Sequence, residues 1–226
     1  MAKKKKQKLP EKKSNLTLVY AGVAVAVVVA LILFFHSASQ EKPAENPITT
    51  RQNATLNIST IYEPGKVKII EFLKFNCPFC YRLHTNMPQI LEKYGDNVTI
   101  TYVPIVWPGE STKSIEAYII AEQMGKGKEM QDAMFKEAAA EGLTNGNENL
   151  IMMNSVPTLE RVAASIGLGA DFNATLEKND AMGAARLNLE FMNKYGVDST
   201  PTILVNGKNI GSTAADLDAS LSSLLS

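Results

Sequence analysis

The chain has 226 residues, only two of which are cysteines, and its formal net charge is zero. This length allows one or two domains with a hydrophobic core, and two cysteines are too few for a disulfide framework. The charge is unevenly spread, because seven lysines and one glutamate give residues 1–15 a charge of +6 and leave −6 on the remainder. Such a lysine run occurs in nucleic-acid-binding tails and beside membrane spans, so the residues after it decide its meaning.

An apolar stretch follows the lysine run. It begins at Leu16, ends at Phe35 and contains no charged side chain. About 20 such residues cross the ~30 Å hydrocarbon core of a bilayer as a helix. We therefore expect a transmembrane anchor over residues 16–36, with the basic segment 1–15 in the cytoplasm and the remainder of the chain outside it. The lysines are then a topology signal, and no nucleic-acid partner is expected.

The competing interpretation of this segment is a cleaved signal peptide. Ser37, Ala38 and Ser39 are small residues directly after the apolar stretch, as at a cleavage site. The stretch is longer than the apolar part of a signal peptide, about 7 to 15 residues, which favours the anchor. An anchor gives a single-pass protein of the cell membrane, whereas cleavage gives a secreted or periplasmic protein. In both cases the cysteines lie in an oxidising compartment, where a disulfide persists.

The next residues predict a linker and two strands. Residues 37–53 combine prolines, polar side chains and charges without apolar periodicity, which indicates a flexible linker. Residues 54–62 alternate between apolar and polar, as in a short half-buried strand. Residues 67–75 form a nearly continuous apolar run, typical of a central strand, with Glu71 in its middle. A carboxylate there is either on a wet edge or buried for a reason, because burial of an unpaired charge is unfavourable.

The two cysteines occur as Cys77-Pro78-Phe79-Cys80, directly after this strand and before a helical pattern. Two cysteines separated by two residues at such a junction are typical of a dithiol/disulfide redox centre. We expect Cys77 to be the nucleophile, because the free N–H groups and the dipole at a helix start favour a thiolate. Cys80, one turn further and less exposed, is expected to resolve the mixed disulfide.

The middle of the chain is predicted to be mostly helical. The helix after the cysteines is expected to be broken or bent at Pro88 and to end at Tyr94, before Gly95. Residues 97–106 indicate a further strand. Between residues 111 and 178 the apolar spacing becomes that of several helices separated by turns, and a further helix is expected over residues 180–195.

The chain closes with a hairpin and a helix. Asn206-Gly207 lies between two apolar runs, which is the strongest short-range hairpin signal. Thr213 and Asp216 fit the cap and third-position pattern of a helix start. The buried stripe of this helix is expected to consist of Leu217, Leu221, Leu224 and Leu225.

In this order the elements resemble the DsbA-like thiol:disulfide oxidoreductases of the thioredoxin superfamily. The resemblance covers roughly residues 54–226 and rests on the Cys-Pro-Phe-Cys motif after its strand, on the helical block, and on Thr200-Pro201 before the hairpin. It implies an α/β thioredoxin fold with a helical subdomain inserted at about residues 109–180. Phe79 departs from the strongly oxidising members, which have a histidine there that helps to stabilise the thiolate. This departure leaves the direction of electron flow open.

The resemblance also implies roles for residues around the cysteines. The bond between Thr200 and Pro201 is expected to be cis and to face the disulfide, with the Thr200 backbone pairing with an extended substrate. Pro78 and Phe79 are expected to contact the substrate beside it. Glu71 corresponds to a buried acid that relays protons to the resolving cysteine. The plainer alternatives are an ordinary turn proline at the start of a strand and a satisfied structural carboxylate.

We therefore expect a thiol:disulfide oxidoreductase that forms disulfides in exported proteins and is reoxidised by a DsbB-like or VKOR-like membrane partner. One alternative is a reductase or isomerase fed by a membrane electron donor, and another is a non-catalytic binding or chaperone module with a structural disulfide. No cofactor is expected beyond a redox-active disulfide between Cys77 and Cys80. No metal site is expected either, because His36 lies at the membrane edge and His84 alone cannot complete a closed site with two cysteines.

Overall fold

The computed structural model describes residues 66–226. The predicted basic segment 1–15, membrane anchor 16–36, linker 37–53 and strand at residues 54–62 lie outside these described residues and stay predictions. Within residues 66–226, no helix combines the length and the apolar character needed to cross a membrane.

Four strands form one mixed sheet in the order β2-β1-β3-β4. Their bounds are Val67–Leu73 for β1, Val98–Pro104 for β2, Thr202–Val205 for β3 and Lys208–Gly211 for β4. β1 pairs in parallel with β2 and antiparallel with β3, and all its residues except Lys68 are buried. The pairing sets Leu73 beside Pro104 and Phe72 beside Thr202. The ends of β1 and β2 and the start of β3 therefore meet at one edge of the sheet.

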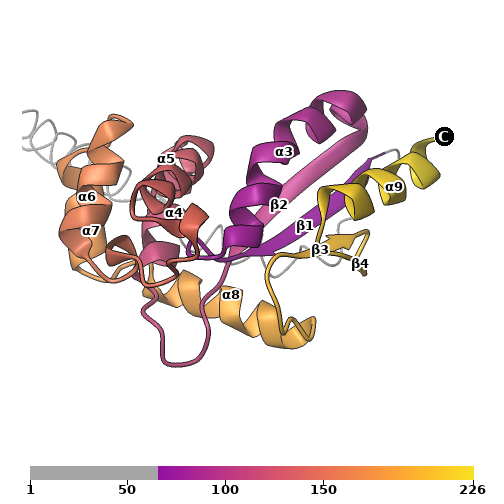
Figure 1. The fold of residues 1–226 in the computed structure, drawn as a ribbon. Coiled ribbons are helices and arrows are strands. Elements are labelled where there is room, and N and C mark those ends of the chain that lie inside the picture. The colour runs from indigo at the N-terminus through magenta and orange to yellow at the C-terminus, as the bar shows by residue number, and fades with distance from the viewer. Residues whose placement is uncertain (1–65) are drawn as a thin grey trace, which may run out of the picture. The chain divides into compact units, whose positions relative to one another are not determined.

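Helices cover both faces of this sheet (Figure 1). α3 (Pro78–Tyr94) and α9 (Ala214–Leu225) lie on one face, and α8 (Met182–Lys194) lies on the other. Successive side chains of a strand point to opposite faces. Ile69 accordingly joins the core beneath α3 and α9, whereas Phe72 joins the core above α8.

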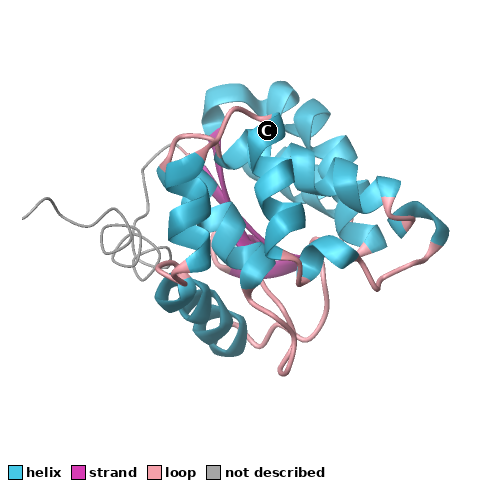
Figure 2. Cartoon of the chain, turned by 90° about the vertical axis from the view of Figure 1, so that its left-hand side faces the viewer, coloured by secondary structure: helices cyan, strands magenta, loops and turns pink. Residues whose placement is uncertain are grey.

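A block of helices is inserted between β2 and α8, and it faces the viewer in Figure 2. Its helices are α4 (Lys113–Gln123), α5 (Gly127–Ala140), α6 (Val156–Ser165) and α7 (Ala170–Glu177). The apolar core of this block extends to the two cysteines, because Cys77 and Cys80 share one buried cluster with Phe135. The predicted thioredoxin-like α/β fold with an inserted helical subdomain is confirmed.

α3 begins and ends where the sequence indicates, but it is not broken at Pro88. The helix is continuous through that residue and ends before Gly95, whose φ of 53° is left-handed. A proline in a helix interior removes one hydrogen bond and crowds the carbonyl four residues earlier. Buried Met87 and Ile90 flank Pro88 in the core beneath α3, so packing keeps the helix intact on both sides of it. Of the predicted break or bend at Pro88, the break is excluded, because this tertiary contact outweighs the local preference.

The predicted hairpin joins β3 to β4. Asn206 and Gly207 have φ values of 50° and 79°, the two positive values that a tight hairpin turn requires. Asn206 also ties the turn to the first strand, since its Oδ1 accepts from the N–H of Lys68 at 2.9 Å and its own N–H donates to the Lys68 carbonyl at 2.8 Å.

The last helix has the predicted capping box. The N–H of Asp216 donates to Oγ1 of Thr213 at 3.1 Å, and the N–H of Thr213 donates back to Oδ2 of Asp216 at 3.0 Å. The buried stripe is narrower than predicted: Leu217 and Leu221 are fully buried, whereas Leu224 is 52 % exposed. The prediction that Leu224 belongs to the buried stripe was wrong, because only one side of α9 touches the sheet and Leu224 lies off that side.

Replacing Thr213 with alanine tests this cap. The substitution leaves the first turn of α9 without its side-chain acceptor, so we expect the free energy of unfolding to fall by about 1 kcal/mol in urea denaturation. Thr213→Ser keeps a hydroxyl at the same place and should stay close to the parent chain. An alanine variant as stable as the parent would show that the cap does not contribute to stability.

Candidate active site

The two cysteines lie at the N-terminus of α3, at the sheet edge where three strands meet. Cys77 is the capping residue of the helix, and Pro78 is its first residue, where a missing N–H leaves no donor unpaired. The Sγ of Cys77 accepts from the backbone N–H of Cys80 at 3.4 Å and so takes the place of a capping oxygen. The helix dipole favours a negative charge on this sulfur, and no acidic residue in the first turn of α3 opposes that charge.

Cys80 lies one turn into the helix and is deeper than Cys77. Cys80 is 0 % exposed and Cys77 is 9 % exposed, so Cys80 is the less exposed of the two, as the sequence predicts. The Sγ of Cys80 accepts from the N–H of Lys74 at 3.5 Å. Both cysteines are free thiols in the structure, so the redox-active disulfide between them stays a prediction.

The loop before β3 supplies the opposite wall of the site. The bond between Thr200 and Pro201 is cis, as the resemblance implies. The Sγ of Cys77 lies 3.2 Å from the carbonyl oxygen of Thr200, to which the protonated thiol donates. Residues 123 positions apart are thereby in contact, and the two predicted halves of the site come together.

The surroundings separate the acidities of the two thiols. A hydrogen bond from the Cys80 side chain is the main reason that the pKa of Cys77 falls to about 6; the backbone N–H groups of Phe79 and Cys80 add to this effect, and burial opposes it. Burial raises the pKa of Cys80 well above its usual range, and the neighbouring Cys77 raises it further. At neutral pH Cys77 is therefore mostly a thiolate, while Cys80 holds its proton.

Glu71 lies in β1 and is fully buried. Within residues 66–226, neither oxygen of its carboxyl group has a hydrogen-bond partner. Burial raises the pKa of Glu71 to about 8, and the negative charge of Cys77 adds to the rise. The edge position considered from the sequence is therefore excluded, and the alternative of a satisfied carboxylate does not fit its unpaired oxygens. Glu71 holds a proton at neutral pH and is electrostatically coupled to both cysteines.

Phe79 is the exposed residue of the motif, with 61 % of its surface accessible. The guanidinium carbon of Arg82 lies 4.5 Å from the centre of its ring. Phe79 lines two hollows, one of about 370 Å³ with Arg82 and residues 212–215, and one of about 220 Å³ that contains Cys77 and Pro78. An exposed aromatic ring between two hollows is suited to contact with a bound polypeptide.

The profile of a family described as thioredoxin matches residues 63–223, more than half of the chain. The chain belongs to the thioredoxin family.

Relatives and solved structures agree with this family. The thiol:disulfide interchange protein DsbA of Pseudomonas syringae pv. tomato is 27 % identical over 185 residues, 81 % of each chain. DsbA of Burkholderia cepacia is 22 % identical over 155 residues, which are 64 % of this chain and 65 % of that protein. The crystal structure of DsbA from Xylella fastidiosa matches with a TM-score of 0.58 at 24 % identity and covers 71 % of this chain and 85 % of that one. The crystal structure of oxidised BdbD from Bacillus subtilis matches with a TM-score of 0.56 at 20 % identity. The match covers 72 % of this chain and 89 % of that one.

Beside the cysteines of this thioredoxin-family chain lie three residues that the sequence alone did not identify as part of the site: Lys74, Glu110 and Trp107. The side chain of Lys74 is only 6 % exposed, and its Nζ lies 2.7 Å from a carboxylate oxygen of Glu110. The same ammonium group lies 5.2 Å from the ring centre of Trp107, and the backbone N–H of Trp107 donates to Oε2 of Glu110 at 2.6 Å. A lysine at the end of an apolar strand was the only available signal, because its partners come from a loop more than thirty residues later.

His84 contacts the inserted helices. Its Nε2 lies 3.1 Å from Oδ1 of Asp132, and its ring centre lies 4.7 Å from that of Phe135, both on α5. Burial lowers the pKa of His84, and the Asp132 carboxylate opposes that shift. These contacts give His84 a packing role between α3 and the insertion.

Metal ligands are not gathered in the described part of the chain. Within residues 66–226, no three side chains of histidine, cysteine, aspartate or glutamate are grouped so as to hold a metal ion. The polar neighbours of the two sulfurs are each other, the Thr200 carbonyl and the backbone N–H groups of Lys74 and Cys80, which fits sulfur exchange.

Proposed function

We propose that this protein is a thiol:disulfide oxidoreductase that acts as an oxidant and forms disulfide bonds in exported proteins. The observation that carries this proposal is the thiol of Cys77, which lies at a helix start, faces Thr200 at 3.2 Å and has a pKa of about 6. A stabilised thiolate favours the reduced form of the pair, so its disulfide readily accepts electrons. Relatives named thiol:disulfide interchange proteins support the same class.

The exchange consists of two sulfur transfers. A substrate thiolate attacks Sγ of Cys77 in the disulfide form, the bond to Cys80 breaks, and Cys80 leaves as a thiolate that takes up a proton. A second substrate thiolate then attacks the substrate sulfur of the mixed disulfide and releases Cys77 as a thiolate. The two substrate thiols lose two electrons and become a disulfide, while the cysteine pair gains the two electrons.

Glu71 fits the role of proton donor to the leaving sulfur. The pKa of Cys80 lies well above its usual range because of burial, so Cys80 needs a proton as the bond breaks. Burial also keeps the carboxyl of Glu71 protonated up to a pH of about 8. A protonated acid coupled to a buried sulfur supports the predicted proton relay.

The substrate would lie across the loop before β3. The cis bond leaves the backbone of Thr200 beside the reacting sulfur, where an extended chain could add as a further strand. Pro78 and Phe79 line the hollow that contains Cys77 and would contact the residues flanking the substrate cysteine.

We further propose that the enzyme acts outside the cytoplasm from a membrane anchor. The apolar residues 16–35 after a basic segment support this location. The reduced pair would then be reoxidised by a membrane partner of the DsbB-like or VKOR-like kind.

The reduction potential of the pair tests the direction of electron flow. The pKa of Cys77, about 6, lies between the thiol pKa values of thioredoxin, about 7, and DsbA, about 3.5. We therefore expect a potential between about −270 and −120 mV, measured in glutathione buffers with the full chain. A value at or below that of thioredoxin would reject the oxidant and favour a reductase fed by a membrane electron donor.

A further inference from the structure

Two adjoining hollows run from Cys77 towards the inserted helices and form one groove. The first hollow, about 220 Å³, contains Cys77, Asn76, Trp107 and Glu148. The second, about 280 Å³, shares Asn76 and Glu148 with the first and continues along the loops that follow β2 and α5. We refer to the two together as the Glu148 groove.

The charges in this groove do not balance. Lys74 lines it, but its ammonium group is neutralised by Glu110 at 2.7 Å. The Glu148 side chain is exposed, and within residues 66–226 no donor pairs with its carboxylate; only its backbone carbonyl accepts a hydrogen bond. Lys74, Glu110 and Glu148 together leave one negative charge beside the reacting sulfur.

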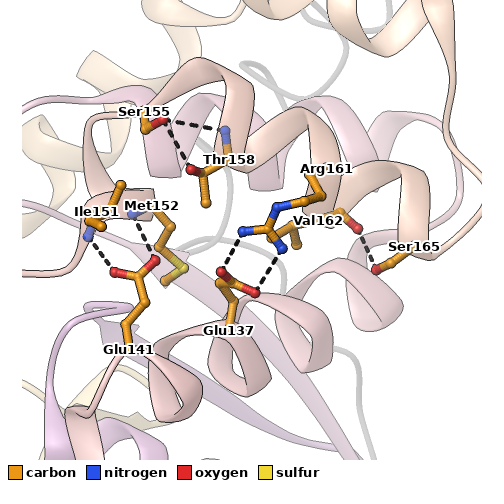
Figure 3. A network of polar contacts seen from close by, with 9 residues as sticks. All are labelled: Glu137, Glu141, Ile151, Met152, Ser155, Thr158, Arg161, Val162 and Ser165. Atoms are coloured by element: carbon orange, nitrogen blue, oxygen red, sulfur yellow. Dashed lines mark hydrogen bonds and ion pairs between the residues drawn. The ribbon is translucent and has the colours of Figure 1, made fainter.

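The loop that carries Glu148 is held in place from both sides. The Nδ2 of Asn76, the residue before Cys77, donates to the Glu148 carbonyl at 3.0 Å. On the far side, the carboxylate of Glu141, the residue that caps the C-terminus of α5, accepts from the backbone N–H groups of Ile151 and Met152, as Figure 3 shows. Because the backbone on both sides of Glu148 is anchored, only its side chain loses conformational entropy when a ligand binds the carboxylate.

We propose that the Glu148 groove binds a lysine or arginine side chain of the substrate protein, close to the cysteine that is being oxidised. This inference rests on the proposed function and adds a substrate preference to it. The carboxylate of Glu148 pairs with the cationic head, and the ring of Trp107 supports the aliphatic stem. An extended chain advances about 3.3 Å per residue, so side chains one or two positions from the substrate cysteine reach the groove.

Dithiol peptides that differ only in charge test this proposal. Three reduced peptides carry lysine, glutamine or glutamate two positions from each cysteine, and each is mixed with the oxidised full chain at low ionic strength. Trp107 is the only tryptophan and lines the groove, so its fluorescence follows reduction of the neighbouring disulfide in a stopped-flow experiment. For the parent chain we expect the lysine peptide to react about fivefold faster than the glutamine peptide and the glutamate peptide to react slowest.

Two variants separate a local effect of Glu148 from a change in net charge. Glu148→Gln should bring the ratio of lysine to glutamine rates close to one, and any general change in thiol reactivity cancels in this ratio. Glu92→Gln removes the same charge from an exposed residue roughly 20 Å further along α3 and should keep the parent ratio. Added salt should lower the ratio in the parent and in Glu92→Gln.

The outcomes distinguish this inference from the function on which it rests. Equal rates for the three peptides, or an unchanged lysine preference in Glu148→Gln, would overturn the groove assignment while leaving the oxidoreductase in place. If the chain oxidises none of the peptides, the proposed function and the groove assignment both fall.

Discussion

Cys77→Ser will reduce the rate of disulfide exchange to that of the uncatalysed reaction. The serine hydroxyl cannot form a disulfide, and Cys80, the other cysteine of the chain, is fully buried. The expected measurement is oxidative refolding of a reduced substrate protein by catalytic amounts of the oxidised chain. Cys80→Ser is the matched variant, because it also removes one sulfur but leaves the more exposed Cys77, which is 9 % accessible. When Cys80→Ser is mixed with a substrate protein that contains a disulfide, the Cys77 thiolate attacks that disulfide and one substrate sulfur leaves as a thiolate. Without the Cys80 sulfur to release it, the mixed disulfide should accumulate as a covalent complex on a non-reducing gel.

The two variants also test the order of the cysteines. If Cys77→Ser still catalyses refolding, Cys77 is not the nucleophile. A covalent complex that forms with Cys77→Ser instead of Cys80→Ser would reverse the two roles. If the parent chain itself exchanges with no disulfide, a non-catalytic binding or chaperone module becomes the better account.

Glu71→Gln will stabilise the reduced chain increasingly as the pH rises. The folded pKa of Glu71 is about 8, raised by burial from an ordinary value of 4.5. Below the unfolded value the carboxyl is protonated in both states and has no pH-dependent effect. As the pH rises towards 8, the unfolded state gains by releasing its proton and the folded state does not, so stability is lost across this window. The advantage of glutamine over glutamate should therefore grow to roughly 3 kcal/mol at pH 7.

The measurement is the free energy of unfolding in urea at several values from pH 4.5 to 8. A buried amide can be less favourable than a protonated carboxyl, but that difference does not depend on pH, so the slope is the informative quantity. The control is Glu92→Gln, whose side chain is exposed and whose difference from the parent should change little with pH. A pH-independent difference for Glu71→Gln would mean that Glu71 is ionised in the folded chain.

Local sequence patterns predicted the elements and the reacting pair. The Asn206-Gly207 turn and the Thr213 cap depend on residues within a few positions of each other, and both are confirmed. Cys77 and Cys80 were recognisable because their spacing has a specific chemical meaning. Packing explains where the helices differ from the sequence pattern. α3 continues through Pro88 because the core holds the helix on both sides of it, and Leu224 is exposed because it lies off the side of α9 on which Leu217, Leu221 and Leu225 contact the core.

The environment of the cysteines could not be derived from local patterns. Lys74, Trp107 and Glu148 meet only because separate segments end at the same edge of the sheet. A single sequence contains no periodicity that links a strand end to a loop seventy residues later. The burial of Glu71, by contrast, was foreseen as one of two options, and the structure decided between them.

The topology also separates substitutions that change the acidity of the thiols from substitutions that change substrate choice. The helical block leaves the sheet where β2 ends, at the same edge as the cysteines, and its core reaches Cys80 while its loop carries Glu148 along the outer rim. Substitutions in the buried part of the block would alter the acidity of the thiols, whereas substitutions in the loop would alter only which polypeptides are accepted. Redox strength and substrate choice can thus diverge independently among related chains, although both are set within a few ångströms of the same sulfur.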